Sequence, residues 1–209
     1  MTTTDDKPAI RDQQQLRDHF GKVSALAEKK VLPRLDRFCR DFIALSPFLV
    51  LASSDGNGNA DASPRGDAPG FVAVLDDKTL LIPDRRGNNR IDSFQNIVDA
   101  PGVGLIFFVP GIDETLRVNG KAAITQDAEL LAPLVARNVT PTIGLKVTVE
   151  ETYFHCGKAL MRSKLWDKGA QVERSTFPTL GRIISEQTAA ISVEEAETAM
   201  VEAYAKRLY

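Results

Sequence analysis

The chain has 209 residues, of which 43% are hydrophobic and 26% are charged, and its formal net charge is -2 at pH 7. These values are ordinary for a single globular domain with a full hydrophobic core. The acidic balance argues against a general nucleic-acid binder, and no apolar run approaches the roughly 20 residues of a membrane span. The N-terminus lacks the apolar core of a signal peptide. We therefore expect a cytoplasmic protein whose two cysteines are reduced thiols.

The first 45 residues are predicted to form an N-terminal helical extension. A disordered lead is expected over residues 1–9, followed by helices over residues 12–20 and 24–30. A third helix is expected to begin at Pro33, because proline suits the first helical position. Its apolar residues have the i, i+3, i+4, i+7 spacing of a buried face: Leu35, Phe38, Cys39, Phe42 and Ile43. Because Cys39 lies within this stripe, we interpret it as a small core residue rather than a reactive thiol.

From residue 46 onward the pattern changes to short strands joined by turns. Ser46-Pro47 ends the helical pattern, and the sequence DGNGN at residues 55–59 is typical of a hairpin turn. Strands are predicted over residues 48–53, 60–63, 71–75, 79–83, 102–109, 114–125 and 145–150. Helices are expected over residues 89–98, 128–136, 156–165 and 193–207, the last with a capping box formed by Ser192 and Glu195.

Strands joined mostly by tight turns indicate an antiparallel sheet, and a sheet of this size tends to close into a barrel to remove its edges. The predicted fold class is therefore mainly β with flanking helices (α+β), an antiparallel β-barrel with N- and C-terminal helices. We expect residues 46–167 to form the barrel domain and residues 168–209 a C-terminal helical tail. The strand–helix alternation of a doubly wound fold is absent, as are the GxGxxG and GxxxxGK(S/T) motifs of nucleotide-binding loops.

The most informative segment runs from Leu80 to Ile97, where an apolar strand is followed by an arginine-rich loop and an amphipathic helix. Guanidinium groups match phosphate oxygens in bidentate geometry, Gly87 allows close backbone approach, and amides at a helix start favour an anion. These features indicate a site for a dianion such as a phosphate monoester, formed by Arg85, Arg86, Asn88, Asn89 and Arg90. The alternative is a solvated basic loop that pairs with Asp84 and Asp92.

The sequence leaves open whether two other polar segments contact a ligand. Arg65 and Asp67 lie between two predicted strands and either pair locally or contact a ligand. Thr115, Arg117 and Asn119 share one face of a predicted strand. If that face points into the interior of the sheet, Arg117 needs a polar or charged partner. If it points to water, Arg117 needs no partner.

A third segment combines basic residues with the single tryptophan of the chain. On a helix Lys158, Arg162 and Trp166 recur at i, i+4 and i+8 and share one face. This stripe either covers a flat aromatic ligand or forms an exposed basic face. His155 and Cys156 are adjacent and lack metal-ligand spacing, so a zinc site is not expected in a chain with two histidines. No Ser/His/Asp arrangement stands out, and catalytic residues are not identified.

Together these segments resemble the pyridoxamine 5'-phosphate oxidase-like flavoproteins, a family of FMN-binding split β-barrels. The resemblance rests on FLVLASSDGNG, ASPRGDAPGF, LLIPDRRGNNR, ETLRVNGKA and HCGKALMRSKLW, which fall between residues 46 and 167. In this family FMN lies in a cleft at the interface of a homodimer and contacts both subunits. The resemblance therefore implies FMN as the cofactor and a second copy of the chain as the partner.

The resemblance also implies a role for each candidate residue. Phosphate contacts would come from Arg65 and from the loop residues Arg85, Arg86, Asn88, Asn89 and Arg90. The end of the preceding strand, Ile82, Pro83 and Asp84, would lie along the flavin ring. The neighbouring subunit would contribute Thr115 and Arg117, and the site would be closed by Lys158, Arg162, Ser163 and Trp166.

Two features depart from the family pattern. The authentic oxidase has an Arg-Leu-His segment that handles pyridoxal phosphate, whereas the nearest segment here, residues 162–166, has no histidine. This difference argues against pyridoxamine phosphate as the substrate. The family's phosphate strand usually has Ser-Arg-Lys where this chain has Gly87-Asn88-Asn89, so the individual phosphate ligands stay open.

The function implied is that of an FMN-dependent oxidoreductase acting on an unidentified small molecule, with no nucleic-acid or membrane partner. A cation near the pyrimidine end of the flavin, Arg117 or Lys158, would stabilise its reduced anionic form. One alternative is a non-catalytic flavin-binding or sensing protein on the same fold. Another is a split barrel that binds haem, with His155 as the axial ligand, or a deazaflavin. A nucleotide- or RNA-binding barrel is the weakest alternative, because exposed aromatic residues are not clustered.

Overall fold

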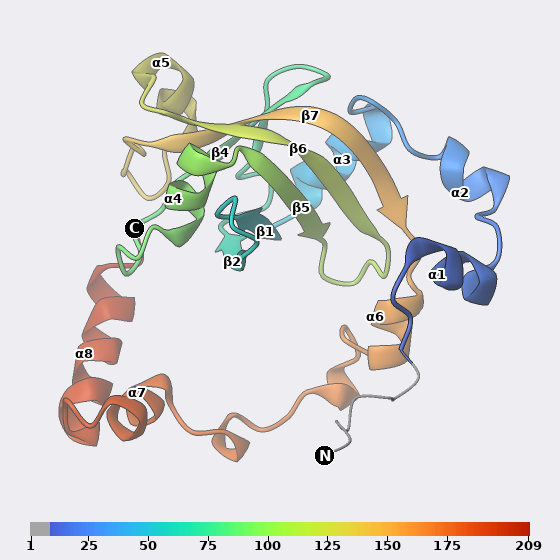
Figure 1. The fold of residues 1–209 in the computed structure, drawn as a ribbon. Helices are drawn as coiled ribbons and strands as arrows, with labels where there is room; N and C mark the ends of the chain where they lie inside the picture. The colour runs from blue at the N-terminus through green and yellow to red at the C-terminus, as the bar shows by residue number, and fades with distance from the viewer. Residues whose placement is uncertain (1–8) are drawn as a thin grey trace. The chain divides into compact units, whose positions relative to one another are not determined.

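The computed structural model describes residues 9–209 and divides the chain into two compact units, residues 1–31 and 32–209 (Figure 1). Residues 1–8 of the disordered lead predicted for residues 1–9 lie outside the described residues. In the first unit the Asp12 carboxylate caps α1 (Gln13–Phe20), and the Ser24 hydroxyl caps α2 (Ala25–Lys29). Neither helix has a buried residue. The domain boundaries predicted at residues 45/46 and 167/168 stay a prediction.

The second unit is built on a seven-stranded sheet in the order β2-β1-β5-β6-β7-β4-β3, and every neighbouring pair is antiparallel. Its strands are β1 (Phe48–Ser54), β2 (Ala60–Gly66), β3 (Ala73–Val74), β4 (Thr79–Pro83), β5 (Gly102–Phe108), β6 (Thr115–Thr125) and β7 (Gly144–His155). In the hairpin between β1 and β2 the Asp55 carboxylate accepts the backbone N–H groups of Asn57 and Asn59. The predicted antiparallel α+β class is confirmed.

The sheet curls back on itself. β2 is the first and β4 the sixth strand in the order, so five strand spacings separate them. A flat sheet would place them roughly 24 Å apart at about 4.8 Å per spacing. Nevertheless Nη1 of Arg65 in β2 lies 3.1 Å from Oδ1 of Asp84, directly after β4. The two ends of the sheet therefore meet without a shared strand ladder, which is the open barrel expected of a split β-barrel.

Helices and short 3-10 turns flank the sheet of the second unit. The α-helices are α3 (Arg37–Leu45), α4 (Asp92–Asp99), α5 (Ala128–Leu131), α6 (Lys158–Ser163), α7 (Leu180–Thr188) and α8 (Val193–Lys206). The 3-10 helices are η1 (Ala132–Leu134), η2 (Lys168–Ala170) and η3 (Arg174–Thr176). Inward residues of the strands form one hydrophobic core with apolar residues of α3 and α4. Among the described residues no helix is both long and apolar enough to cross a membrane.

The third helix begins later than predicted. Leu32 pairs with Thr152 in an isolated bridge, so the chain near Pro33 is extended, and α3 starts where the Asp36 carboxylate accepts the N–H of Cys39. Cys39 is buried as predicted, but Phe38 is 61% exposed. The buried face is narrower than the full apolar pattern, and the Phe38 ring lies instead under the Arg37 guanidinium at 5.1 Å.

Two other predicted helices are shorter than expected. The segment predicted as one helix over residues 128–136 is α5 followed by η1, because Pro133 has no N–H to continue an α-helix. The helix predicted from residue 89 begins at Asp92. Asn89 and Ile91 precede it with φ values of 61° and 53°, and this left-handed backbone is incompatible with a continuous α-helix.

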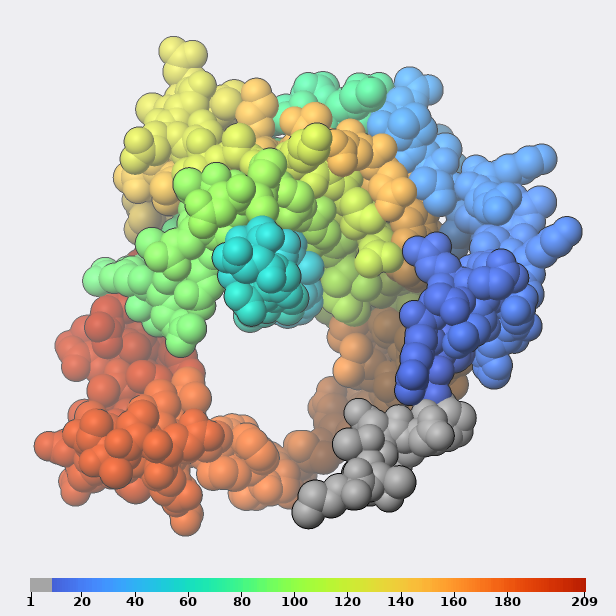
Figure 2. All heavy atoms as spheres, in the orientation of Figure 1, coloured from blue at the N-terminus to red at the C-terminus, as the bar shows by residue number. Residues whose placement is uncertain are grey.

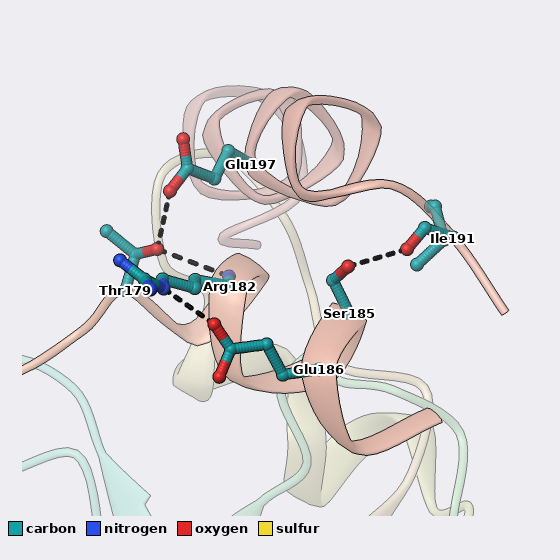
Figure 3. Close-up of polar contacts among 6 residues, drawn as sticks. All are labelled: Thr179, Arg182, Ser185, Glu186, Ile191 and Glu197. Carbon is teal, nitrogen blue, oxygen red and sulfur yellow. Dashed lines mark hydrogen bonds and ion pairs between the residues drawn. The ribbon is translucent and has the colours of Figure 1, made fainter. Parts of the chain in front are cut away.

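Near the end of the chain α7 and α8 form a helical hairpin, of which only α8 was predicted. The Thr179 hydroxyl accepts the N–H of Arg182 and donates to Glu197 at 2.7 Å, and Ser185 donates to the Ile191 carbonyl at 2.7 Å (Figure 3). Gly181 allows the helices to touch, because a Cβ there would lie 2.7 Å from the Glu197 nitrogen. The capping box predicted at the start of α8 is confirmed.

Candidate functional site

The arginine-rich loop occupies residues 84–91, between the last residue of β4 and the first residue of α4. Pro83 is the last residue of β4 paired with β7, and the Asp84 N–H then donates to the Ile143 carbonyl. Beyond this bond the loop has no regular structure. Ile91 adopts a left-handed conformation at the N-cap of α4, where no side chain caps the helix. The loop and its arginines therefore connect two regular elements, the paired end of β4 and the start of α4.

A cavity of about 570 Å³ opens over this loop. Its walls come from β2, Phe71, the loop itself with Pro83 before it, the first turn of α4, and Leu208 beyond α8. The cavity brings together eight of the predicted site residues: Arg65, Pro83, Asp84, Arg85, Arg86, Asn88, Asn89 and Arg90. Ile82 does not line it. That side chain is 1% exposed and belongs to the hydrophobic core, because alternate residues of β4 face opposite sides of the sheet.

Aspartates form ion pairs with most of the arginines in the cavity. The ion pairs join Arg65 to Asp84, Arg85 to Asp67 and Arg90 to Asp92. The local pair between Arg65 and Asp67 that the sequence left open is therefore not formed, because each side chain reaches across to the loop after β4. The part of the chain that the structure describes offers no carboxylate partner to Arg86, which is exposed.

Arg65 carries a guanidinium nitrogen that the protein leaves unpaired. Its Nη1 donates to Asp84 at 3.1 Å, and the group lies 5.7 Å from the centre of the Phe94 ring. Its Nε is buried and, within residues 9–209, is the one buried side-chain nitrogen or oxygen that has no hydrogen-bond partner. A buried donor without a partner costs about 1–3 kcal/mol. An anionic oxygen of a ligand in this cavity would satisfy it.

Arg85 is held through one edge of its guanidinium. Its Nε donates to Oδ2 of Asp67 at 2.7 Å, and the Asp67 side chain is only 3% exposed. The described residues provide no partner for the two Nη groups, and Arg85 lines the cavity. An arginine fixed at Nε with both Nη groups available has the geometry for bidentate binding of a phosphate or carboxylate.

The pKa values of Asp67, which is buried, and Asp84, which is partly exposed, are shifted in opposite directions. Burial raises the pKa of Asp84, and the Arg65 guanidinium offsets this only in part. Burial also pushes the pKa of Asp67 upward, but hydrogen bonds from Tyr209, the Ala68 N–H and Arg85 outweigh it, so the net pKa is lowered. The lowered pKa keeps Asp67 ionised beside Arg85, whereas the raised pKa makes Asp84 easier to protonate than an ordinary aspartate.

The first turn of α4 adds backbone donors. Asp92, Ser93 and Phe94 line the cavity, and no side chain caps their N–H groups. Their dipoles favour an anion. Two carboxylates already lie near this positive end, since Asp61 accepts the Ser93 hydroxyl at 2.6 Å and Asp92 lies in the same turn.

The remaining predicted site residues lie elsewhere. Thr115 is buried in β6, whereas Arg117 points to solvent and donates to the Tyr153 hydroxyl at 2.8 Å. Lys158, Arg162 and Ser163 are exposed on α6.

Trp166 does not continue the face shared by Lys158 and Arg162, so the predicted three-residue stripe is wrong. The helix ends at Ser163, and Lys164 adopts the left-handed conformation that terminates it. Trp166 instead donates from Nε1 to the Ile112 carbonyl at 2.9 Å. It forms an apolar patch with Phe48, Val50, Phe108, Pro110 and Leu165.

Pairing with β7 places the end of β4 and the start of β6 at opposite ends of that strand. Pro83 pairs with Gly144 at the start of β7, and Thr115 pairs with His155 at its end. Across the curled sheet the two groups are closer than the length of β7, because Arg65 pairs with Leu49, Leu49 with Phe107 and Phe107 with Leu116, which places Arg65 three strand spacings, roughly 14 Å, from Leu116. Thr115, Arg117 and the α6 residues are nevertheless not among the residues that line the cavity of their own chain.

Sequence reasoning missed several residues of the cavity. Phe94 and Ser93 were assigned only to the helix pattern, and Leu208 and Tyr209 to no site. The Tyr209 hydroxyl donates to Asp67 at 2.6 Å across 142 positions of sequence, and no local pattern signals such a contact. Among the described residues, no group of three or more His, Cys, Asp or Glu side chains could hold a metal ion.

Solved structures with similar folds have low sequence identity to this chain. A proposed pyridoxamine 5'-phosphate oxidase of Lactobacillus delbrueckii is 21% identical, with a TM-score of 0.46, and the match covers 58% of this chain and 95% of that one. The HupZ protein of Group A Streptococcus is 18% identical, with a TM-score of 0.44 and coverage of 56% and 91%. An FMN-binding protein of Syntrophomonas wolfei is 11% identical, with a TM-score of 0.45 and coverage of 68% and 96%.

Comparison with curated proteins found no match. The sequence does match a family model, that of pyridoxamine 5'-phosphate oxidase, over residues 35–156. This match covers more than half of the 209 residues and includes all seven strands, the arginine-rich loop and α4. The chain therefore belongs to the pyridoxamine 5'-phosphate oxidase family.

Proposed function

We propose that the protein binds FMN, with the 5'-phosphate in the cavity over residues 84–91. The observation that carries this proposal is the cavity itself, where Arg65, Arg85 and Arg86 offer guanidinium N–H groups that have no partner among residues 9–209. Uncapped amides of α4 add backbone donors at the same place. A phosphate monoester has the charge and the number of oxygens to use these donors together.

We further propose that the protein acts as a homodimer with each FMN between two subunits. The position of Thr115, Arg117 and Lys158 supports this arrangement, because these predicted site residues do not line the cavity of their own chain. The apolar patch around Trp166 supports it too, since Phe48 and Leu165 expose apolar surface there.

The proposed activity is that of an FMN-dependent oxidoreductase on a small molecule. When bound, FMN supplies the redox chemistry. The residues of the chain would bind and orient it: Arg65, Arg85 and Arg86 hold the phosphate, and Pro83 and Asp84 lie along the ring. Arg117 or Lys158 of the second subunit would place a positive charge near the ring, which stabilises a reduced anionic flavin.

An absorption spectrum of the purified protein tests the cofactor directly. We expect a yellow protein that releases FMN on denaturation, or an apoprotein that takes up added FMN. A colourless protein that fails to bind added FMN would refute the proposal, and a haem or deazaflavin spectrum would replace it with another cofactor. Rapid anaerobic reduction by NADH or NADPH, followed by turnover with an acceptor, would distinguish an enzyme from a non-catalytic flavin protein.

Arginine substitutions locate the phosphate site. A charge-assisted hydrogen bond contributes about 1.5–3 kcal/mol, so Arg86→Ala should weaken FMN binding roughly 10- to 100-fold, and Arg86→Ala with Arg90→Ala should weaken it further. The matched control is Arg182→Ala, which removes an exposed arginine paired with Glu186 on α7. Unchanged FMN affinity in the double variant would exclude this loop as the phosphate site.

A further inference from the structure

The last residues of the chain return to the cavity from a distant part of the sequence. Leu208 is one of the cavity-lining residues, and the Tyr209 hydroxyl donates to Oδ1 of Asp67 at 2.6 Å. Figure 2 shows the red atoms at the end of the chain next to the green atoms that include the loop and α4. The segment after α8 therefore contributes to the wall of this cavity.

Tyr209 lies between two arginines. The Arg85 guanidinium is 5.9 Å from the centre of its ring, and the Arg137 guanidinium is 5.0 Å from the same centre. Both distances are within the range of cation–π attraction. Both the hydroxyl and the ring of Tyr209 are therefore held by contacts, and one of the contacting groups is Arg85, which lines the cavity.

The contacts of Asp67 connect Tyr209 to Arg85. One carboxylate oxygen accepts the Tyr209 hydroxyl and the Ala68 N–H, and the other accepts Nε of Arg85. Since Asp67 is fixed by three donors, the Nε edge of Arg85 is fixed as well. The two Nη groups are then left in one orientation beside the cavity. The Tyr209 ring packs near the same guanidinium and limits its alternative rotamers.

We propose that Tyr209 is a positioning residue for phosphate recognition, which acts through Asp67 and the ring contact to hold Arg85 in its bidentate orientation. This inference rests on the proposed binding of FMN. Tyr209 itself does not touch the phosphate. Its effect is to lower the conformational freedom that Arg85 would otherwise lose when the ligand binds. The end of the chain is then a part of the ligand site that the match to the family, over residues 35–156, does not include.

The test compares FMN with riboflavin, which has the same ring system but no phosphate. Tyr209→Phe keeps the ring and removes only the hydroxyl that holds Asp67. We expect it to weaken FMN binding roughly fivefold, because part of one charge-assisted hydrogen bond is lost. Tyr209→Ala, which also removes the ring, should weaken it by roughly 20-fold or more. Riboflavin affinity should not change in either variant.

The matched control is Tyr204→Phe, which changes an exposed tyrosine on α8 that is 61% exposed. It should leave both affinities as in the wild type. If Tyr209→Phe and Tyr209→Ala bind FMN like the wild type, the inference is wrong. Equal losses for FMN and riboflavin would also overturn it, because they indicate a general structural role. If the wild type itself binds neither compound, the proposed function fails, and this outcome is distinct from the other two.

Discussion

Gly120 offers a sharp test of the register between β6 and β7. It lies at the bulge in β6, where the pairing shifts between Asn119 and Gly120 and leaves Glu150 without a partner in the ladder. A Cβ on residue 120 would overlap the carbonyl oxygen of Thr148, with the Thr148 carbon at 3.0 Å and Val149 Cα at 3.2 Å. These are backbone atoms, so a side-chain rotation cannot relieve the overlap.

The size of the effect follows from how β7 is held. A normal carbon–oxygen contact is about 3.3 Å or longer, so Gly120→Ala must displace one strand by more than about 1 Å. Residues of β7 pair with β6 on one side and β4 on the other, and the Val149 N–H also donates to Lys78. Several backbone hydrogen bonds at about 1 kcal/mol each would be distorted together with the packing. We expect a loss of about 3–5 kcal/mol in the free energy of unfolding.

Urea denaturation followed by circular dichroism provides the measurement, with Gly102→Ala as the control. Gly102 is also a strand glycine, in β5, but nothing lies within 4 Å of a Cβ built there. The control should be neutral or slightly stabilised, since alanine lowers the entropy of the unfolded chain. If Gly120→Ala unfolds at the same urea concentration as Gly102→Ala, the β6–β7 register described above is wrong.

Two further predictions concern buried titratable groups. A thiol reagent should modify the exposed Cys156 rapidly in the native protein and Cys39 only after unfolding, because burial raises the pKa of Cys39. Rapid modification of both cysteines in the native protein would contradict the assignment of Cys39 to the core. The lowered pKa of Asp67 means that its stabilisation is present above its ordinary value of 3.8 and is lost as pH falls through the lower folded value. Denaturation midpoints of Asp67→Asn should therefore depend less on pH below about 3.8 than those of the wild type, and equal slopes would refute this.

The strands were largely predictable from the sequence because local chemistry specifies them. In β6 the apolar residues Leu116, Val118 and Ala122 alternate with other residues and are all buried, as a period of two requires. The α7 helix was not predicted, since its stability depends on α8, which packs against Gly181. The exposure of Phe38 has a similar cause: an apolar pattern marks residues able to pack inward, but the neighbouring elements decide which of them do.

The candidate site was also predictable only where its residues are close together in the sequence. The loop, its arginines and the following helix were visible in the sequence because they are contiguous. Their partners were not, because Asp67 and Tyr209 are 18 and 124 positions from Arg85. The helical face expected to include Trp166 was wrong because Lys164 ends the helix in a left-handed conformation that an ordinary lysine does not signal.

The ion pairs change how the arginine-rich loop should be understood. By charge alone the loop looks strongly cationic, but Asp67, Asp84 and Asp92 compensate three of the four cavity arginines. Compensation prevents mutual repulsion among the guanidinium groups, so they can be held close together before any ligand arrives. Each pair also fixes only part of a guanidinium and leaves other N–H groups for an anion. Affinity for a phosphate would then come mainly from donors already in position rather than from net charge. On this reasoning Arg86, which lacks a compensating carboxylate in the described structure, should contribute most of the salt-dependent part of binding.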